Sequence, residues 1–96
     1  MKGCVFSPDA QSDIDAIWDY TFKDWGADQA ETYLRLLQNA SRMIAENPRI
    51  GRECPDIRAG YRKYPAGSHM MFYRVRRDSI EIVRILHQRM DFGAHL

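Results

Sequence analysis

The chain has 96 residues, which is enough for one small domain spanning residues 1–96 and too few for two. Hydrophobic residues make up 45% of the chain and charged residues 28%, a composition that argues against disorder. No apolar run is long enough to cross a membrane, the N-terminal segment has no signal-peptide core, and two cysteines are too few for a disulfide scaffold. We therefore expect a cytoplasmic protein with no membrane partner.

The formal net charge of +1 conceals a difference between the two halves of the chain. Residues 1–47 carry a net charge of −4, whereas residues 48–96 carry +5, and almost all of that positive charge is arginine. Two interpretations stay open. The arginines either form a solvated surface and ion pairs with the acidic half, or they present a surface to an acidic partner or a nucleic acid.

A short strand is predicted at residues 2–6, followed by a helix. Ser7 is a favoured N-cap and Pro8 a favoured first helical residue. Gly26 is a suitable residue to end the helix. Apolar positions recur with helical spacing between these ends, and the two tryptophans among them are expected to lie in the core: Ile14, Ile17, Trp18, Thr21 and Trp25.

A second helix is predicted from about Asp28 to Glu46, and it ends where Asn47 precedes Pro48. Two helices joined at a single glycine should form an antiparallel hairpin. The segment that follows, Asn47–Gly51, is interpreted as a structural corner in which the glycine permits an unusual backbone angle.

Three further strands are predicted at residues 57–64, 69–76 and 79–86, with turns at residues 65–67 and 77–78. The short connections favour an antiparallel meander. The complete order is β-α-α-β-β-β, which is an α+β fold with an antiparallel sheet and the helical hairpin packed on one face. The first strand is expected at an edge of the sheet.

Both faces of this predicted sheet are apolar. In the strand predicted at residues 69–76, one face carries Met71, Tyr73 and Val75, and the other carries Met70, Phe72 and Arg74. In the strand predicted at residues 79–86, Val83 and Ile85 are expected on one face, and the other face is expected to carry Ile80, Ile82, Arg84 and Leu86. A single layer of helices covers only one face, so either the C-terminal tail or a partner must cover the other. A partner is the favoured interpretation.

Five segments together resemble the RelE/ParE toxin superfamily, and in particular its ParE branch. In chain order they are FSP at residues 6–8, IWDY at 17–20, ENPRIGR at 46–52, FYRV at 72–75 and ILHQRMD at 85–91. The resemblance implies a toxin of a type II toxin–antitoxin system that inhibits DNA gyrase and replication. It also implies a ParD-like antitoxin that binds the toxin directly in a hetero-oligomer, with no sequence-specific DNA binding by the toxin itself.

Site residues follow from this resemblance and from the expected open face of the sheet. The predicted antitoxin contact comprises residues of that face and its rim: Arg58, Arg62, Tyr64, Met70, Phe72, Arg74, Ile82, Arg84 and Leu86. The predicted target contact lies at the end of the last strand and beyond it: Arg84, His87, Arg89, Met90 and Asp91. No cofactor or metal site is predicted, because the cysteines and histidines lack metal-ligand spacing.

Two alternatives remain beside the gyrase toxin. A ribosome-dependent mRNA endoribonuclease of the RelE type would need proton transfer and cationic clamps, for which His87, Arg89 and His95 are the candidates. That branch carries a cluster of lysine and arginine on the sheet and a tyrosine or histidine near the C-terminus, whereas here no tyrosine follows Tyr73 and lysine is nearly absent from the predicted sheet. The other alternative is a degraded family member that retains only antitoxin binding and transcriptional regulation.

Overall fold

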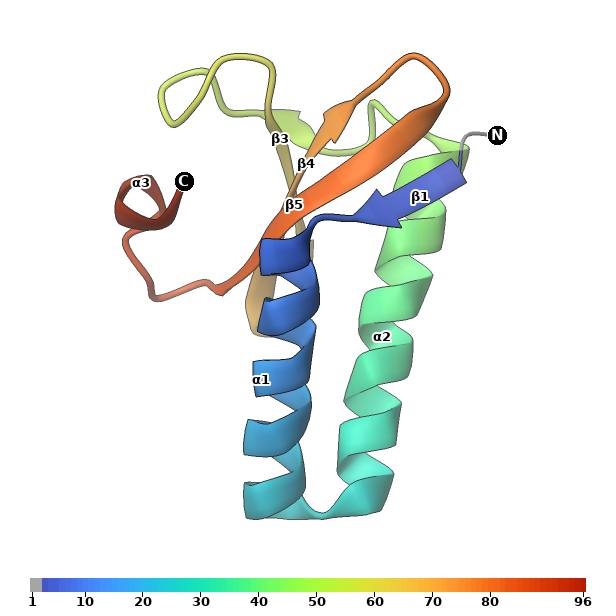
Figure 1. Ribbon diagram of the computed structural model, residues 1–96, viewed down its shortest axis with the longest axis vertical. Helices are drawn as coiled ribbons and strands as arrows, with labels where there is room; N and C mark the ends of the chain where they lie inside the picture. The colour runs from blue at the N-terminus through green and yellow to red at the C-terminus, as the bar shows by residue number, and fades with distance from the viewer. Residues whose placement is uncertain (1–2) are drawn as a thin grey trace.

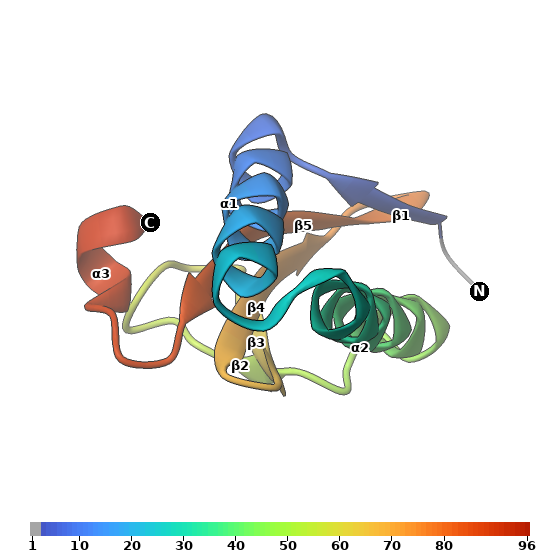
Figure 2. The same cartoon turned by 90° about the horizontal axis from the view of Figure 1, so that it is seen from below.

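The computed structural model describes residues 3–96, which form one sheet with a long helical hairpin against it (Figure 1). In chain order the elements are β1 (Gly3–Phe6), α1 (Pro8–Trp25), α2 (Ala27–Glu46), β2 (Arg52–Glu53), β3 (Arg62–Ala66), β4 (His69–Val75), β5 (Ser79–His87) and α3 (Phe92–His95). The strand order is β1-β5-β4-β3-β2. The predicted α+β class, with the hairpin on one face, is confirmed (Figure 2).

The sheet is mixed, so the prediction of an antiparallel sheet was wrong for its first strand. β1 pairs in parallel with β5, from Gly3 opposite Ser79 to Phe6 opposite Ile82. The chain between β1 and β5 includes both helices and β2–β4, so it is long enough for a parallel pair, whereas the short turns that predict an antiparallel meander lie only within residues 57–86. β1 is an edge strand, as expected, although Lys2 of the predicted strand lies outside the described residues.

The helix boundaries follow the local sequence signals. Ser7 Oγ accepts a hydrogen bond from Ala10 N at 3.0 Å and donates one to Val83 O at 2.7 Å, so the N-cap also ties α1 to β5. Gly26, with φ of +90°, separates the two helices. The predicted helices are therefore confirmed, with α2 starting one residue earlier than expected.

The strand predicted at residues 57–64 begins only at Arg62. The preceding residues form a turn, in which Ile57 N donates to Cys54 O at 3.0 Å and Cys54 N donates to Tyr61 O at 3.1 Å. Gly60 has φ of +82°, which an extended strand does not accommodate. The short strand β2 was not predicted, because two residues carry no periodic signal.

A β-bulge in β5 changes which side chains face the helices. Phe72 pairs with Arg84 and Tyr73 pairs with Ile82, which leaves Val83 as the extra residue. Ile82 before the bulge and Ile85 after it therefore both reach the helix-facing core. The predicted alternation, which placed Val83 with Ile85 and Ile82 with Leu86, was wrong because a single strand was assumed to keep one parity.

The second face of the sheet is covered by the chain itself. Phe72 and Leu86 are buried there together with Cys54 and Tyr61. Phe92 of the C-terminal segment packs edge-on against Phe72, with ring centroids 4.9 Å apart. The favoured interpretation of an open apolar face awaiting a partner was therefore wrong, since the tail and the 54–61 turn supply the apolar cover.

The Asn47–Gly51 corner depends on the buried phenol of Tyr73. Its Oη accepts a hydrogen bond from Gly51 N at 2.9 Å and donates one to Pro48 O at 2.7 Å. A Cβ at Gly51 would lie 2.4 Å from this oxygen. The corner is structural, as predicted, but Gly51 is required for close approach rather than for a positive φ.

Replacing Tyr73 with phenylalanine should lower the free energy of unfolding by about 2 kcal/mol, because the buried Gly51 N–H and the partly buried Pro48 carbonyl lose their partner. Urea denaturation of the purified protein measures this change. Tyr64→Phe is the matched control, since that hydroxyl reaches only Met43 Sδ at 3.9 Å. Equal losses in the two variants would contradict the assigned role of Tyr73.

Candidate functional site

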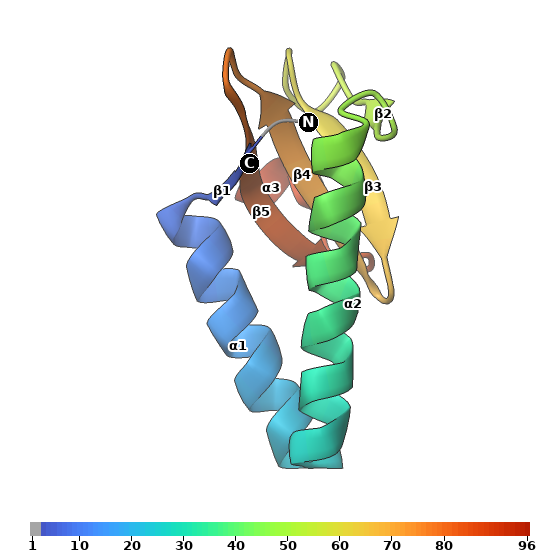
Figure 3. The same ribbon diagram turned by 90° about the vertical axis from the view of Figure 1, so that its right-hand side faces the viewer.

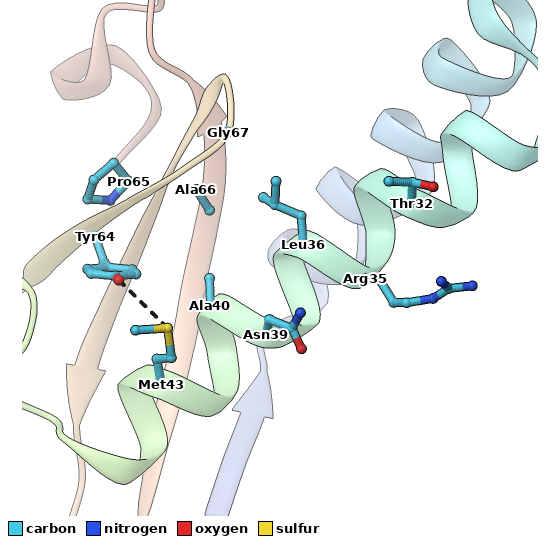
Figure 4. A pocket seen from close by; sticks show the side chains of 10 residues that line it. All are labelled: Thr32, Arg35, Leu36, Asn39, Ala40, Met43, Tyr64, Pro65, Ala66 and Gly67. Carbon is cyan, nitrogen blue, oxygen red and sulfur yellow. Dashed lines mark hydrogen bonds between the residues drawn. The ribbon is translucent and has the colours of Figure 1, made fainter.

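A groove of about 500 Å³ runs between α2 and the β3–β4 hairpin (Figure 4). From α2, Leu36, Ala40 and Met43 line it at i, i+4 and i+7, so they share one side of that helix. The opposite wall is the chain from Tyr64 to Gly67. These side chains give the groove a predominantly apolar lining.

The hydroxyl of Tyr33 fixes one end of the groove. It accepts a hydrogen bond from Ser68 N at 2.9 Å and lies 2.5 Å from His69 Nδ1. Gly67 has φ of +59°, and a Cβ there would come within 2.7 Å of this hydroxyl. α2 is thereby held against the hairpin turn, so the groove has walls that are set before any partner binds.

The rim of the groove is polar and carries positive charge. Thr32, Arg35 and Asn39 line it on the α2 side. Arg35 Nη2 lies 3.9 Å from Glu31 Oε2, and Arg42 donates a hydrogen bond to Asn39 Oδ1. Pro65 on the other side has no N–H to offer an added strand. An apolar channel with a basic rim fits an amphipathic helical segment that carries acidic residues better than it fits an extended strand.

A second hollow, of about 430 Å³, lies near the β2 end of the sheet. Tyr64 and Pro65 line it as well as the groove, and Met70 and Ile50 add apolar surface. Two residues of the predicted antitoxin contact, Tyr64 and Met70, therefore lie at solvent-accessible hollows on adjacent parts of the surface.

Three arginines of that predicted contact already interact within the chain. Arg62 Nη1 donates to Gly51 O at 2.7 Å, and the Arg58 guanidinium lies 5.5 Å from the centre of the Tyr61 ring. Arg74 Nε donates to Glu81 Oε1 at 2.6 Å, and this hydrogen bond is the main reason that the pKa of the Glu81 carboxyl is lowered. A partner's carboxylate would compete with these contacts.

The apolar members of the predicted contact from the sheet interior lie elsewhere. Phe72 and Leu86 are buried beneath the tail and the 54–61 turn, and Ile82 is buried beneath the helices. A partner cannot reach these three side chains in this structure.

Arg84, predicted for both contacts, is occupied by Asp13 of α1. Its Nε and Nη2 donate to the two carboxylate oxygens at 2.8 and 2.9 Å, and Nη1 donates to His95 O at 3.0 Å. Asp13 also accepts from Ile85 N at 2.9 Å. The hydrogen bonds to Asp13 raise the pKa of Arg84, so this guanidinium stays charged and internally paired.

The predicted target segment forms an exposed turn after β5. Arg89, Met90 and Asp91 are exposed there, and Arg89 N donates to His87 Nδ1 at 3.1 Å. The His87 ring stacks edge-on against His69 at 5.4 Å between ring centroids. Among residues 3–96, the His87 ring contacts His69, whereas the backbone oxygen of His95 in α3 accepts a hydrogen bond from Arg84.

The sequence did not predict the cluster of Tyr33, His69 and His87. No motif joins these residues: the strand register places His69 opposite His87, and Tyr33 reaches them from α2. Burial, reinforced by the nearby charge of His87, lowers the pKa of His69 to about 4. The imidazole is therefore neutral at physiological pH and serves as a fixed partner of the Tyr33 hydroxyl.

Residues 3–96 contain neither a metal site nor a membrane-spanning helix. In that range no three histidine, cysteine, aspartate or glutamate side chains are grouped closely enough to hold a metal ion. None of its helices is both long and apolar enough to cross a membrane. Cys4 and Cys54 are both free thiols, and burial raises the pKa of each.

Comparison with known proteins gives one consistent result. The family model described as "ParE toxin of type II toxin-antitoxin system, parDE" matches residues 4–92. "Toxin ParE1" of Mycobacterium tuberculosis is 56% identical over 93 residues, covering 96% of this chain and 95% of that protein. "Toxin ParE1" of Caulobacter vibrioides is 47% identical over 96 residues, covering 100% and 99%.

A solved structure agrees in fold. A chain of the "Chromosomal ParDE TA system from P. aeruginosa" superposes with a TM-score of 0.79 over 91% of this chain and 96% of that one, at 21% identity.

The neutral His69 predicts a loss of stability in acid. The unfolded histidine takes up a proton near pH 6.5, whereas the folded one does so only near pH 4, so stability falls as the pH drops between these values. The full effect is at most about 3 kcal/mol. Denaturation at pH 7.5 and 4.5 should show a smaller acid loss for His69→Gln, and an identical loss would contradict this assignment.

Proposed function

Because the chain belongs to the ParE toxin family of type II toxin–antitoxin systems, we propose that it inhibits DNA gyrase and replication and that a ParD-like antitoxin neutralises it by direct binding. The observation that carries this proposal is the similarity to toxins of the same family across nearly the full length of each chain. The toxin acts by binding its target rather than by its own catalysis.

The groove between α2 and the β3–β4 hairpin, called the α2–β3 groove from here on, is the principal antitoxin contact in this proposal. Its apolar floor would receive one face of an amphipathic helix, and acidic residues of that helix would meet Arg35 and Arg42 at the rim. Tyr64 and Met70 extend the contact to the second hollow. The buried side chains of Phe72, Ile82 and Leu86 are left out of it, which narrows the contact expected from the sequence.

The remaining arginines of the predicted contact have a secondary role. Arg58, Arg62 and Arg74 do not line the groove, and each, like Arg35 with Glu31, already has a partner within the chain. An antitoxin carboxylate would exchange one charged contact for another, which favours specificity and association rate over affinity. The apolar groove therefore supplies most of the binding free energy.

The arrangement of the candidate catalytic residues supports binding over ribonuclease chemistry. A general acid and base must both come within hydrogen-bond reach of the reacting phosphate. Here His87 is stacked on His69, and His95 belongs to a segment that packs on the opposite face of the sheet from the hairpin. Such chemistry would require these residues to rearrange.

Induction of the toxin without its antitoxin should stop DNA synthesis before protein synthesis, because gyrase is the proposed target. Pulse labelling with a nucleoside and an amino acid after brief induction measures the order. The double variant His87→Ala/His95→Ala should remain toxic. An early stop in translation, with messages cut in coding regions and toxicity lost in that variant, would favour the ribonuclease.

A charge in the groove should weaken neutralisation by the antitoxin while sparing toxicity. Met43→Asp places a carboxylate on the apolar floor and should weaken antitoxin binding by about tenfold or more. Val75→Asp is the matched control, since both side chains are 45% exposed and Val75 lies outside the groove. Calorimetry with the purified antitoxin measures the affinity, and equal effects in the two variants would place the contact elsewhere.

A further inference from the structure

The end of the helical hairpin carries large aromatic side chains that the core does not use. The last turns of α1 extend beyond the sheet (Figure 3), and within α1 only Ala10, in its first turn, is buried. Trp25 is 70% exposed, so the prediction that it lies in the core was wrong. Phe22 is 51% exposed.

Three of these aromatic residues share one side of the helix. Trp18, Phe22 and Trp25 are spaced at i, i+4 and i+7, and the rings of Trp18 and Phe22 stack with centroids 6.4 Å apart. We call these three residues the aromatic stripe. It lies on the part of α1 that extends beyond the contacts of the helix with β1 and β5. Apolar surface of this kind on a soluble domain marks an interaction site.

The charges around the stripe indicate the chemistry of its partner. Asp15 and Asp19 lie along one edge of it by helical spacing, and both are exposed. Over residues 15–31 there are five carboxylates and a single lysine. This field repels nucleic acid and attracts a surface that bears lysine or arginine, whose cationic groups also bind favourably over tryptophan rings.

We propose that the stripe of Trp18, Phe22 and Trp25, with Asp15 and Asp19, is the surface through which the toxin binds a basic protein face of its target. This inference rests on the proposed function and specifies which part of the toxin makes contact. It assigns the contact with protein to the end of the acidic hairpin and not to the arginines of residues 48–96. Tryptophans that become buried on binding are frequent hot spots of protein–protein interfaces. We therefore expect a few residues of the stripe to account for most of the binding free energy.

The test compares two sets of exposed substitutions on the same helix. Phe22→Ser/Trp25→Ser removes most of the stripe, and neither side chain belongs to the core. Tyr20→Ser is the matched control, because Tyr20 is 69% exposed but projects from the other side of α1. Circular dichroism and thermal unfolding verify that all variants fold as the wild type does.

Inhibition of gyrase supercoiling by each purified toxin is the first readout. The double variant should need at least about tenfold more protein than wild type for half inhibition, whereas Tyr20→Ser should stay within about twofold. Asp15→Asn/Asp19→Asn should weaken inhibition at low salt and reduce its dependence on salt concentration. Wild-type inhibition by the Phe22→Ser/Trp25→Ser variant would overturn the proposal.

Two further measurements show whether the stripe instead binds the antitoxin or a second copy of the chain: calorimetry of antitoxin binding, and sedimentation of the toxin alone. Calorimetry should give the same antitoxin affinity for the double variant and the wild type, and a loss confined to antitoxin binding would overturn the proposal. Conversion of a wild-type dimer into a monomer by the same substitutions would also overturn it, since the occupant would then be a second copy of the chain.

Growth arrest separates this proposal from the gyrase assignment. If the wild type arrests growth but leaves gyrase active, the gyrase assignment fails on its own. Arrest by wild type and Tyr20→Ser, but not by Phe22→Ser/Trp25→Ser, would then still support the stripe as the target contact. Equal arrest by all three proteins would overturn it.

Discussion

The carboxylate of Asp13 holds the helical hairpin to the sheet at the point where the sheet is irregular. The bulge in β5 disturbs the ladder around Val83, and Asp13 accepts hydrogen bonds from the Ile85 N–H and from the Arg84 guanidinium beside it. Both side chains are largely shielded from water, so each charge depends on the other. One acidic residue of α1 thus fixes the helix position and provides an acceptor for the backbone N–H of Ile85.

The bulge also determines how the two faces of the sheet are filled. Because it shifts the alternation of β5, Ile80, Ile82 and Ile85 all face the helices, while Leu86 joins Phe72 on the other face. Arg84 Nη1 in turn binds the backbone oxygen of His95, which holds the C-terminal segment near the cover that Phe92 provides. Hairpin, sheet and tail are therefore linked through the Asp13–Arg84 ion pair. Exposed apolar side chains gather at the groove, with Leu36 and Met43, and at the hairpin end, with Phe22 and Trp25.

Local signals in the sequence predicted most of the fold. The Ser7–Pro8 cap, Gly26 and Asn47–Pro48 set the helix ends, because capping and steric exclusion act over a few residues. The parallel pairing of β1, the bulge at Val83 and the cover by Phe92 were not predictable, because each depends on contacts between distant segments. The predicted antitoxin contact failed at Phe72, Ile82 and Leu86 for the same reason, whereas Tyr64 and Met70 lie at accessible hollows.

The two halves of the chain differ in how many of their charged side chains are paired within the fold and how many are exposed. Much of the arginine in the second half is engaged within the chain: Arg84 by Asp13, Arg74 by Glu81 and Arg62 by Gly51. A guanidinium that is already paired adds less to a new contact than its formal charge suggests, because binding must first break that pairing. The acidic helices, by contrast, present exposed carboxylates beside exposed aromatic rings. The net charge of each half is therefore a poor guide to where partners bind, and the state of each side chain in the fold is a better one.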